Sequence, residues 1–280
     1  MQKYEWSEKN IPLEKINSIT SKIADDLRNL DFFCLWLIGD IGAGKTTLFR
    51  LLNATLKPTN GTLRFDGEDL SSLSGRDLRS VRRRIGTIYQ QQHLVPSLSV
   101  LENTLCGKLG SWSFASTLIS LVRPRKQEIA QAQAALESVG LADKQRARAD
   151  ELSGGQQQRL TIARVLMQDP DVILADEPFA SLDPALAETI SSLLLGLASN
   201  SHRTLVATMH DVELALKLFP RIIGIREGRI VFDLAAAAVD RVAVAGLYAG
   251  EQTDGAGGAV GTAAAEANEN ERRSRSACAR

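Results

Sequence analysis

Residues 32–47 read Phe-Phe-Cys-Leu-Trp-Leu-Ile-Gly-Asp-Ile-Gly-Ala-Gly-Lys-Thr-Thr. The apolar run 32–38 predicts a parallel strand, because strands covered on both faces are apolar throughout. A helix is expected from Thr47 to Asn53. A Gly-rich loop between a strand and a helix turns backbone N–H groups and the positive end of the helix toward one point, where an anion binds. The stretch therefore predicts an α/β fold that binds a nucleotide through its phosphates.

The residues of this loop have distinct expected roles. The glycines let the backbone turn tightly. Lys45 supplies a positive charge to the β and γ phosphates, and the Thr46 hydroxyl is expected to bind Mg²⁺. The simpler interpretation is a Gly-rich turn that only caps a helix. The complete set expected to bind the nucleotide is Gly39, Asp40, Ile41, Gly42, Ala43, Gly44, Lys45, Thr46 and Thr47.

Short apolar strands recur along the chain and alternate with helical segments. This alternation predicts an α/β core with a mostly parallel sheet, a P-loop NTPase core. Residues 93–150 lack strand patterns, so a helical subdomain inserted at about 93–150 is expected, with its clearest helix at 127–139. A small and incomplete antiparallel β-subdomain completes the predicted fold. The expected strands are 85–89, 172–175 and 204–209, and the expected hairpins turn at Asp66-Gly67 and Glu227-Gly228.

Residues 172–177 read Val-Ile-Leu-Ala-Asp-Glu and place two carboxylates at the tip of a buried strand. A carboxylate in that position is favoured if it faces a cation, so Asp176 is expected to hold Mg²⁺ directly or through water. Side chains alternate along a strand, which directs Glu177 toward the γ phosphate as the group that polarises the attacking water. The alternative is a helix start, since Pro178 follows.

Residues 152–159 read Leu-Ser-Gly-Gly-Gln-Gln-Gln-Arg. Ser153 followed three residues later by Gln156 is a capping box, which by itself predicts a helix start. The same capped N-terminus with two glycines also forms an anion site. Since the γ phosphate already has Lys45 in its own chain, this face is expected to serve a second chain, in a C₂ pair that shares two ATP molecules. The residues are Ser153, Gly154, Gly155 and Gln156.

The order of these motifs resembles the ABC ATPase family over about residues 37–233. The resemblance implies that Gln90 senses Mg²⁺ and the attacking water, although Gln91 and Gln92 follow directly. It implies that His210 contacts the γ phosphate and that Asp183, in Ser-Leu-Asp-Pro, belongs to a loop that crosses the interface of the pair. Helix capping is the alternative for both His210 and Asp183.

Weaker signals around residues 105–124, 211–216 and 222–233 resemble the phosphonate importer branch of that family. Amino-acid and methionine importer ATPases are near alternatives. The resemblance implies an ATP-hydrolysing subunit, with ATP and Mg²⁺ as cofactors, at the cytoplasmic face of the membrane. Its implied partners are a second ATPase subunit, transmembrane permease subunits and, indirectly, a periplasmic or lipid-anchored solute-binding protein.

The N-terminus departs from the family pattern. Residues 16–30 predict an amphipathic helix, and residues 1–47 resemble the ATPase of tRNA threonylcarbamoyl modification. The segment 1–36 is therefore atypical for an ABC ATPase. Two alternative functions stay open here: a soluble P-loop ATPase in tRNA modification, and a fusion product that binds ATP without coupling.

The composition bounds the remaining possibilities. The 280 residues carry a formal net charge of zero, so no global basic field predicts nucleic-acid binding. The three cysteines are scattered, and no apolar run approaches the roughly 20 residues that span a bilayer. Residues 250–280 hold almost no large apolar side chains and predict a disordered tail after an ATPase domain at 1–249.

Overall fold

A computed structural model describes residues 33–39, 42–111, 124–179, 182–200, 203–209 and 212–248. The chain divides after Val239 into two units. In the second unit, α10 (Arg241–Tyr248) follows Asp240, whose side chain accepts a hydrogen bond from the Ala243 N–H at 2.7 Å. The helix predicted at 16–30, the atypical segment before Phe33 and the tail at 250–280 lie outside the described residues.

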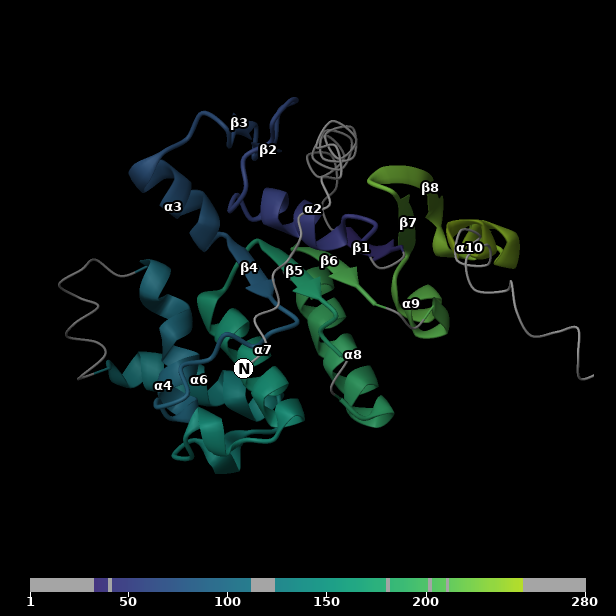
Figure 1. The fold of residues 1–280 in the computed structure, drawn as a ribbon. Coiled ribbons are helices and arrows are strands. Elements are labelled where there is room, and N and C mark those ends of the chain that lie inside the picture. Colours follow the sequence, from purple (N-terminus) through teal and green to yellow (C-terminus); the bar gives the residue numbers. More distant parts are fainter. Residues whose placement is uncertain are drawn as a thin grey trace, which may run out of the picture. The chain divides into compact units, whose positions relative to one another are not determined.

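The first unit is built on a six-stranded sheet (Figure 1), and the sheet is mostly parallel, as the sequence predicted. Neighbouring strands of the order β4-β5-β6-β1-β7 are parallel, and β8 pairs antiparallel with β7 at one edge. The parallel strands place their carboxyl ends along one edge, where ligands bind in open α/β sheets. The strands are β1 (Phe33–Ile38), β4 (Ile85–Ile88), β5 (Val172–Asp176), β6 (Thr204–Thr208), β7 (Arg221–Arg226) and β8 (Arg229–Ala235).

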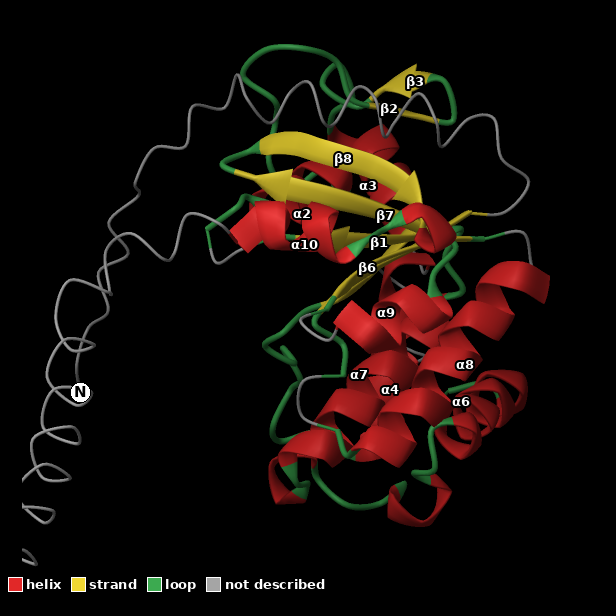
Figure 2. Ribbon diagram, turned by 90° about the vertical axis from the view of Figure 1, so that its right-hand side faces the viewer, coloured by secondary structure: helices red, strands yellow, loops and turns green. Residues whose placement is uncertain are grey.

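Helices cover both faces of the sheet (Figure 2). On one face, α2 (Lys45–Leu52) and α3 (Gly75–Arg83) bury apolar side chains in a cluster with Leu35, Leu174 and Val206. On the other face lie α7 (Gly154–Gln168) and α8 (Pro184–Asn200), which contact β4 and β6 respectively. Burial on both faces explains why the strands are apolar without alternation.

The regular elements among the described residues between 93 and 150 are all helices, as predicted, and no strand occurs in that part of the described chain. They are α4 (Val100–Leu105), η1 (Cys106–Ser111), α6 (Lys126–Ser138), η2 (Ala142–Lys144) and η3 (Ala149–Glu151). Helix α7 packs against α4, α6 and η1. At Gly107 an added Cβ would lie 2.2 Å from the Arg164 carbonyl oxygen, so only glycine allows this close approach of η1 to α7.

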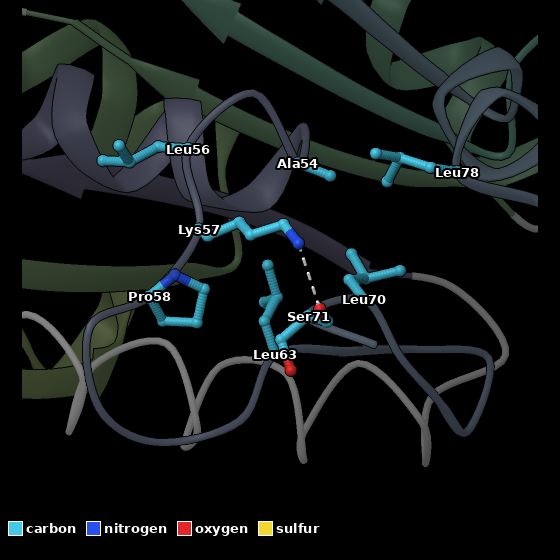
Figure 3. Close-up of a pocket in the computed structure, with 8 residues that line it drawn as sticks. All are labelled: Ala54, Leu56, Lys57, Pro58, Leu63, Leu70, Ser71 and Leu78. Atoms are coloured by element: carbon cyan, nitrogen blue, oxygen red, sulfur yellow. Dashed lines mark hydrogen bonds between the residues drawn. The ribbon is translucent and has the colours of Figure 1, made fainter. Parts of the chain in front are cut away.

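The antiparallel β-subdomain is a two-stranded hairpin among the described residues, β2 (Arg64–Phe65) and β3 (Glu68–Asp69). Asp66 (φ 55°) and Gly67 (φ 83°) occupy its turn, as a tight hairpin requires. Beside the hairpin a small pocket, Figure 3, holds none of the predicted nucleotide residues, and Lys57 Nζ donates there to the Ser71 carbonyl at 3.4 Å. Its lining residues are Ala54, Leu56, Lys57, Pro58, Leu63, Leu70, Ser71 and Leu78.

Two expectations from composition concern the cysteines and the membrane. Cys34 and Cys106 are free thiols, and burial raises the pKa of Cys34 to about 12. No helix within the described ranges is long and apolar enough to cross a bilayer.

Candidate nucleotide site

The P-loop leaves β1 at Gly39 and enters α2 at Lys45. Gly42 (φ 83°) and Gly44 (φ 102°) adopt left-handed conformations that L side chains rarely take, and Gly44 is the N-cap of α2. Helix α2 thus begins two residues before the predicted Thr47, because the Gly44 carbonyl already accepts from the Leu48 N–H at 2.9 Å. Asp40 and Ile41 lie outside the described residues.

Lys45 folds back along the loop that precedes it. Its Nζ donates to the Gly39 carbonyl oxygen at 2.6 Å. The ammonium group is therefore held beside the turn, on the same side as the N-terminus of α2. A positive charge and a helix N-terminus placed together form a site suited to phosphate.

The P-loop is also hydrogen-bonded to the hairpin that joins β7 and β8. The Gly228 N–H donates to the Ala43 carbonyl at 3.0 Å. An added Cβ on Gly39 would lie 2.2 Å from the Ile225 carbonyl oxygen, which belongs to the β7 backbone and has no room to move. The loop is therefore packed too closely on β7 for any side chain at Gly39.

Gly39→Ala is expected to displace the P-loop and to destabilise the fold by about 1–3 kcal/mol, the range for overpacking a tight core. ATP affinity should fall as well, because the loop carbonyl that orients Lys45 moves. Gly196→Ala is the matched control, since a Cβ there meets nothing within 4 Å inside α8. Urea unfolding and ATP titration of both variants check this. Equal behaviour of the two variants would contradict the packing argument.

Asp176 lies at the carboxyl end of β5 and is 8% exposed. Its two carboxylate oxygens accept from two threonine hydroxyls on different elements. Thr46 Oγ1 in α2 donates to Oδ2 at 3.3 Å, and Thr208 Oγ1 at the end of β6 donates to Oδ1 at 2.7 Å. The structure thus brings together Thr46 and Asp176, two of the three residues that the sequence predicted for Mg²⁺. The third, Gln90, bonds Glu177 instead.

Glu177 follows directly and has a left-handed backbone (φ 48°). Gln90, which comes two residues after β4, donates from its Nε2 to Glu177 Oε2 at 3.1 Å. These two predicted residues, 87 positions apart in the chain, are therefore in direct contact. Thr208 was not among the residues predicted for the site. Its membership follows only from the strand register, which places it at the end of β6 directly beside Asp176.

Ser153 forms the capping box that the sequence predicted. Its Oγ accepts from the Gln156 N–H at 3.4 Å, and Gln156 Oε1 accepts from the Ser153 N–H at 3.0 Å. Ser153 and Gly154 are exposed. This N-terminus of α7 belongs to the helical layer, whereas the P-loop leads into α2 on the opposite face of the sheet. Gly155, the third residue of the predicted set, lies in the first turn of α7.

Helix α7 also holds the segment that follows Gln90. Arg164 donates to the carbonyls of His93 at 2.8 Å and Gln92 at 3.2 Å, and Thr161 Oγ1 donates to the Gln92 carbonyl at 3.2 Å. Burial lowers the pKa of Arg164 from its usual range. The helix that presents Ser153 is therefore bonded to the loop that positions Gln90.

Asp183 accepts a hydrogen bond from the Leu186 N–H at 3.0 Å and precedes α8, which begins at Pro184. The capping interpretation of Asp183 is therefore confirmed. A cap at this position is compatible with the expected place of Asp183 in a loop that crosses the interface of the pair. His210 and Ser181 lie outside the described residues.

The site provides hard oxygen donors for a small cation. The Thr46 hydroxyl and the Asp176 carboxylate meet at the end of the P-loop. In the described part of the chain, no three or more His, Cys, Asp or Glu residues cluster as a metal site. Mg²⁺ fits this donor set, because it is commonly bound through one or two protein oxygens, substrate phosphates and water.

A P-loop between a buried parallel strand and a helix, with a carboxylate at the end of a nearby strand, defines a P-loop nucleotide-binding protein. The family model described as ABC transporter matches residues 33–180. The chain belongs to the ABC transporter family and is an ATP-binding subunit that resembles phosphonate importer ATPases.

Two curated relatives carry the name "Phosphonates import ATP-binding protein PhnC". The one from Pseudomonas fluorescens (strain Pf0-1) is 46% identical over 216 residues, which cover 77% of this chain and 81% of the relative. The one from Alcaligenes faecalis is 44% identical over 217 residues, with 78% of each covered.

A solved dimeric structure, titled as a post-hydrolysis state of the ATP-binding cassette MJ0796 bound to ADP and Pi, matches with a TM-score of 0.66 and 30% identity. The matched region covers 74% of this chain and 86% of the chain in that structure. These comparisons support a transporter ATPase, and none of them favours the tRNA-modification alternative.

Proposed function

We propose that this chain is the ATP-hydrolysing subunit of a phosphonate importer. The observation that carries the proposal is the grouping of Lys45, Thr46, Asp176 and Glu177 at the carboxyl edge of one sheet, in a chain 44–46% identical to proteins named for phosphonate import. The solute itself would be recognised by other subunits, because nothing in the nucleotide site selects it.

Each site residue has a proposed role. The P-loop from Gly39 to Thr47 holds the ATP phosphates, with Lys45 as the point charge. Glu177 polarises the attacking water, Gln90 orients Glu177 through the hydrogen bond between them, and His210 contacts the γ phosphate. Thr46 and Asp176 would hold Mg²⁺, which neutralises phosphate charge when bound.

The proposed assembly contains two ATPase chains and a transmembrane permease. The exposed N-terminus of α7, from Ser153 to Gln156, would meet the γ phosphate of ATP bound to the other chain, and Asp183 would lie at that interface. The hydrogen bonds from Arg164 to the Gln92 and His93 carbonyls would transmit movement of α7 to Gln90. The permease would hold the ATPase at the cytoplasmic face of the membrane.

The proposal is tested by purification of the chain with its permease and reconstitution into proteoliposomes. We expect ATP hydrolysis to rise when phosphonate and its binding protein are supplied, and to stay at the basal rate with methionine or other amino acids. Stimulation by an amino acid in place of phosphonate would contradict the assigned solute. Failure to associate with any permease would contradict the transport function.

A further inference from the structure

We infer that Thr208 is a positioning residue for ATP hydrolysis, and that its hydroxyl fixes both the Asp176 carboxylate and the Glu177 backbone. The inference rests on the proposed function, because it assigns Thr208 a task in that same reaction. It adds a residue from β6 to a site so far described from the P-loop and β5.

The Thr208 hydroxyl bonds both of these groups. It donates to Asp176 Oδ1 at 2.7 Å and accepts from the Glu177 N–H at 2.9 Å. Thr208 is 0% exposed, so water does not compete for either bond. One hydroxyl therefore sets the orientation of two consecutive residues, and it does so in a buried setting where hydrogen bonds are strong.

The strand register explains how a residue 32 positions away reaches both groups. Thr208 pairs with Asp176 across the β5–β6 ladder and with Leu37 across the β6–β1 ladder. It thus stands at the carboxyl end of β6, between the strand that carries Asp176 and the strand that leads into the P-loop. Thr46 approaches Asp176 from the P-loop side, so the two threonines hold opposite oxygens of one carboxylate.

The Glu177 backbone gives a second reason for the hydroxyl. Its φ of 48° is uncommon for a residue other than glycine, and such a conformation persists only where the surroundings hold it. The bond from the Glu177 N–H to Thr208 Oγ1 provides that restraint. Without it, the Glu177 carboxylate would lose the fixed position from which it meets Gln90.

A structural role alone does not require a hydroxyl at this point. Valine has nearly the same shape, and β-branched residues suit a buried strand. Among the described residues, the hydroxyl bonds Asp176 and Glu177 alone, and both are proposed to act on the nucleotide. The substitution Thr208→Val therefore removes the two hydrogen bonds while the packing of the strand is largely kept.

The test compares Thr208→Val with two other variants. Thr208→Ser keeps the hydroxyl, and Thr104→Val removes a buried hydroxyl in α4, which within the described chain bonds the Val100 carbonyl and no residue of the nucleotide site. Turnover at saturating ATP, ATP affinity, the Mg²⁺ concentration for half-maximal turnover and the melting temperature are measured for each. The readout that a merely structural threonine would not change is the Mg²⁺ dependence.

For Thr208→Val we expect turnover to fall by about 10- to 100-fold, the effect of losing a hydrogen bond to a charged group, while ATP affinity changes by less than about threefold. More Mg²⁺ should be needed for half-maximal turnover. Thr208→Ser should restore both quantities, and Thr104→Val should alter neither. Wild-type turnover and Mg²⁺ dependence in Thr208→Val would overturn the inference.

Two further results would also overturn it. If Thr208→Val lost stability and ATP affinity together and Thr208→Ser rescued nothing, Thr208 would be a packing residue only. If the wild-type chain, with its permease, bound ATP but never hydrolysed it, the proposed function would fail and this inference with it. The first result leaves the proposed function standing, so the two failures are distinguishable.

Discussion

Glu177→Gln is expected to slow ATP hydrolysis by about 10²–10⁴-fold, the usual contribution of a general base, while ATP still binds. The amide has the shape of the carboxylate but lacks the charge that polarises water. Its backbone bond to Thr208 stays in place, so the fold of the site is kept. Turnover under saturating ATP and a separate ATP titration measure the two quantities.

Glu137→Gln is the control for this variant. Glu137 is an exposed residue of α6, so its substitution removes the same charge outside the nucleotide site. It should hydrolyse ATP at the wild-type rate. Near-normal turnover of Glu177→Gln would remove Glu177 from its proposed role, and the base would have to be sought in another residue of the site.

Lys45→Ala is expected to weaken ATP binding by about 10- to 100-fold, since a hydrogen bond between charged groups contributes about 1.5–3 kcal/mol. Hydrolysis should be lost with the binding. The α2 helix should remain, because Gly44 caps it through its backbone and Lys45 contributes no cap. Nucleotide titration and circular dichroism check the two statements.

Lys144→Ala provides the matched control, as Lys144 is an exposed lysine of η2 in the helical region. Its ATP affinity should equal that of the wild type. An undiminished affinity in Lys45→Ala would mean that the phosphates bind elsewhere than at the P-loop.

The parts of the site that were predictable from the sequence are local. Within a few residues the chain runs from the strand before Gly39 through the glycines to Lys45. The fold of that segment therefore follows from its own sequence. The same holds for the capping box at Ser153 and for the strand that ends at Asp176. In each case the chemistry and its structural support lie within one short stretch.

The parts that were missed depend on pairing between distant strands. Thr208 ends an apolar strand, and nothing in its own neighbourhood distinguishes it from a residue that packs in the sheet. Its partners appear only when β6 is placed between β5 and β1 in a fixed register. The bond between Gln90 and Glu177 likewise joins the ends of two segments that a sequence pattern does not align.

Sedimentation velocity of Glu177→Gln, with and without ATP and Mg²⁺, tests most directly the proposal that two chains share each ATP. We expect a monomer without nucleotide and a dimer with it, because slow hydrolysis preserves the closed state. The double variant with Ser153→Arg should bind ATP equally well and stay monomeric, since the arginine blocks the exposed N-terminus of α7. Equal dimerisation of the two variants, or a Glu177→Gln monomer at saturating ATP, would contradict the shared site.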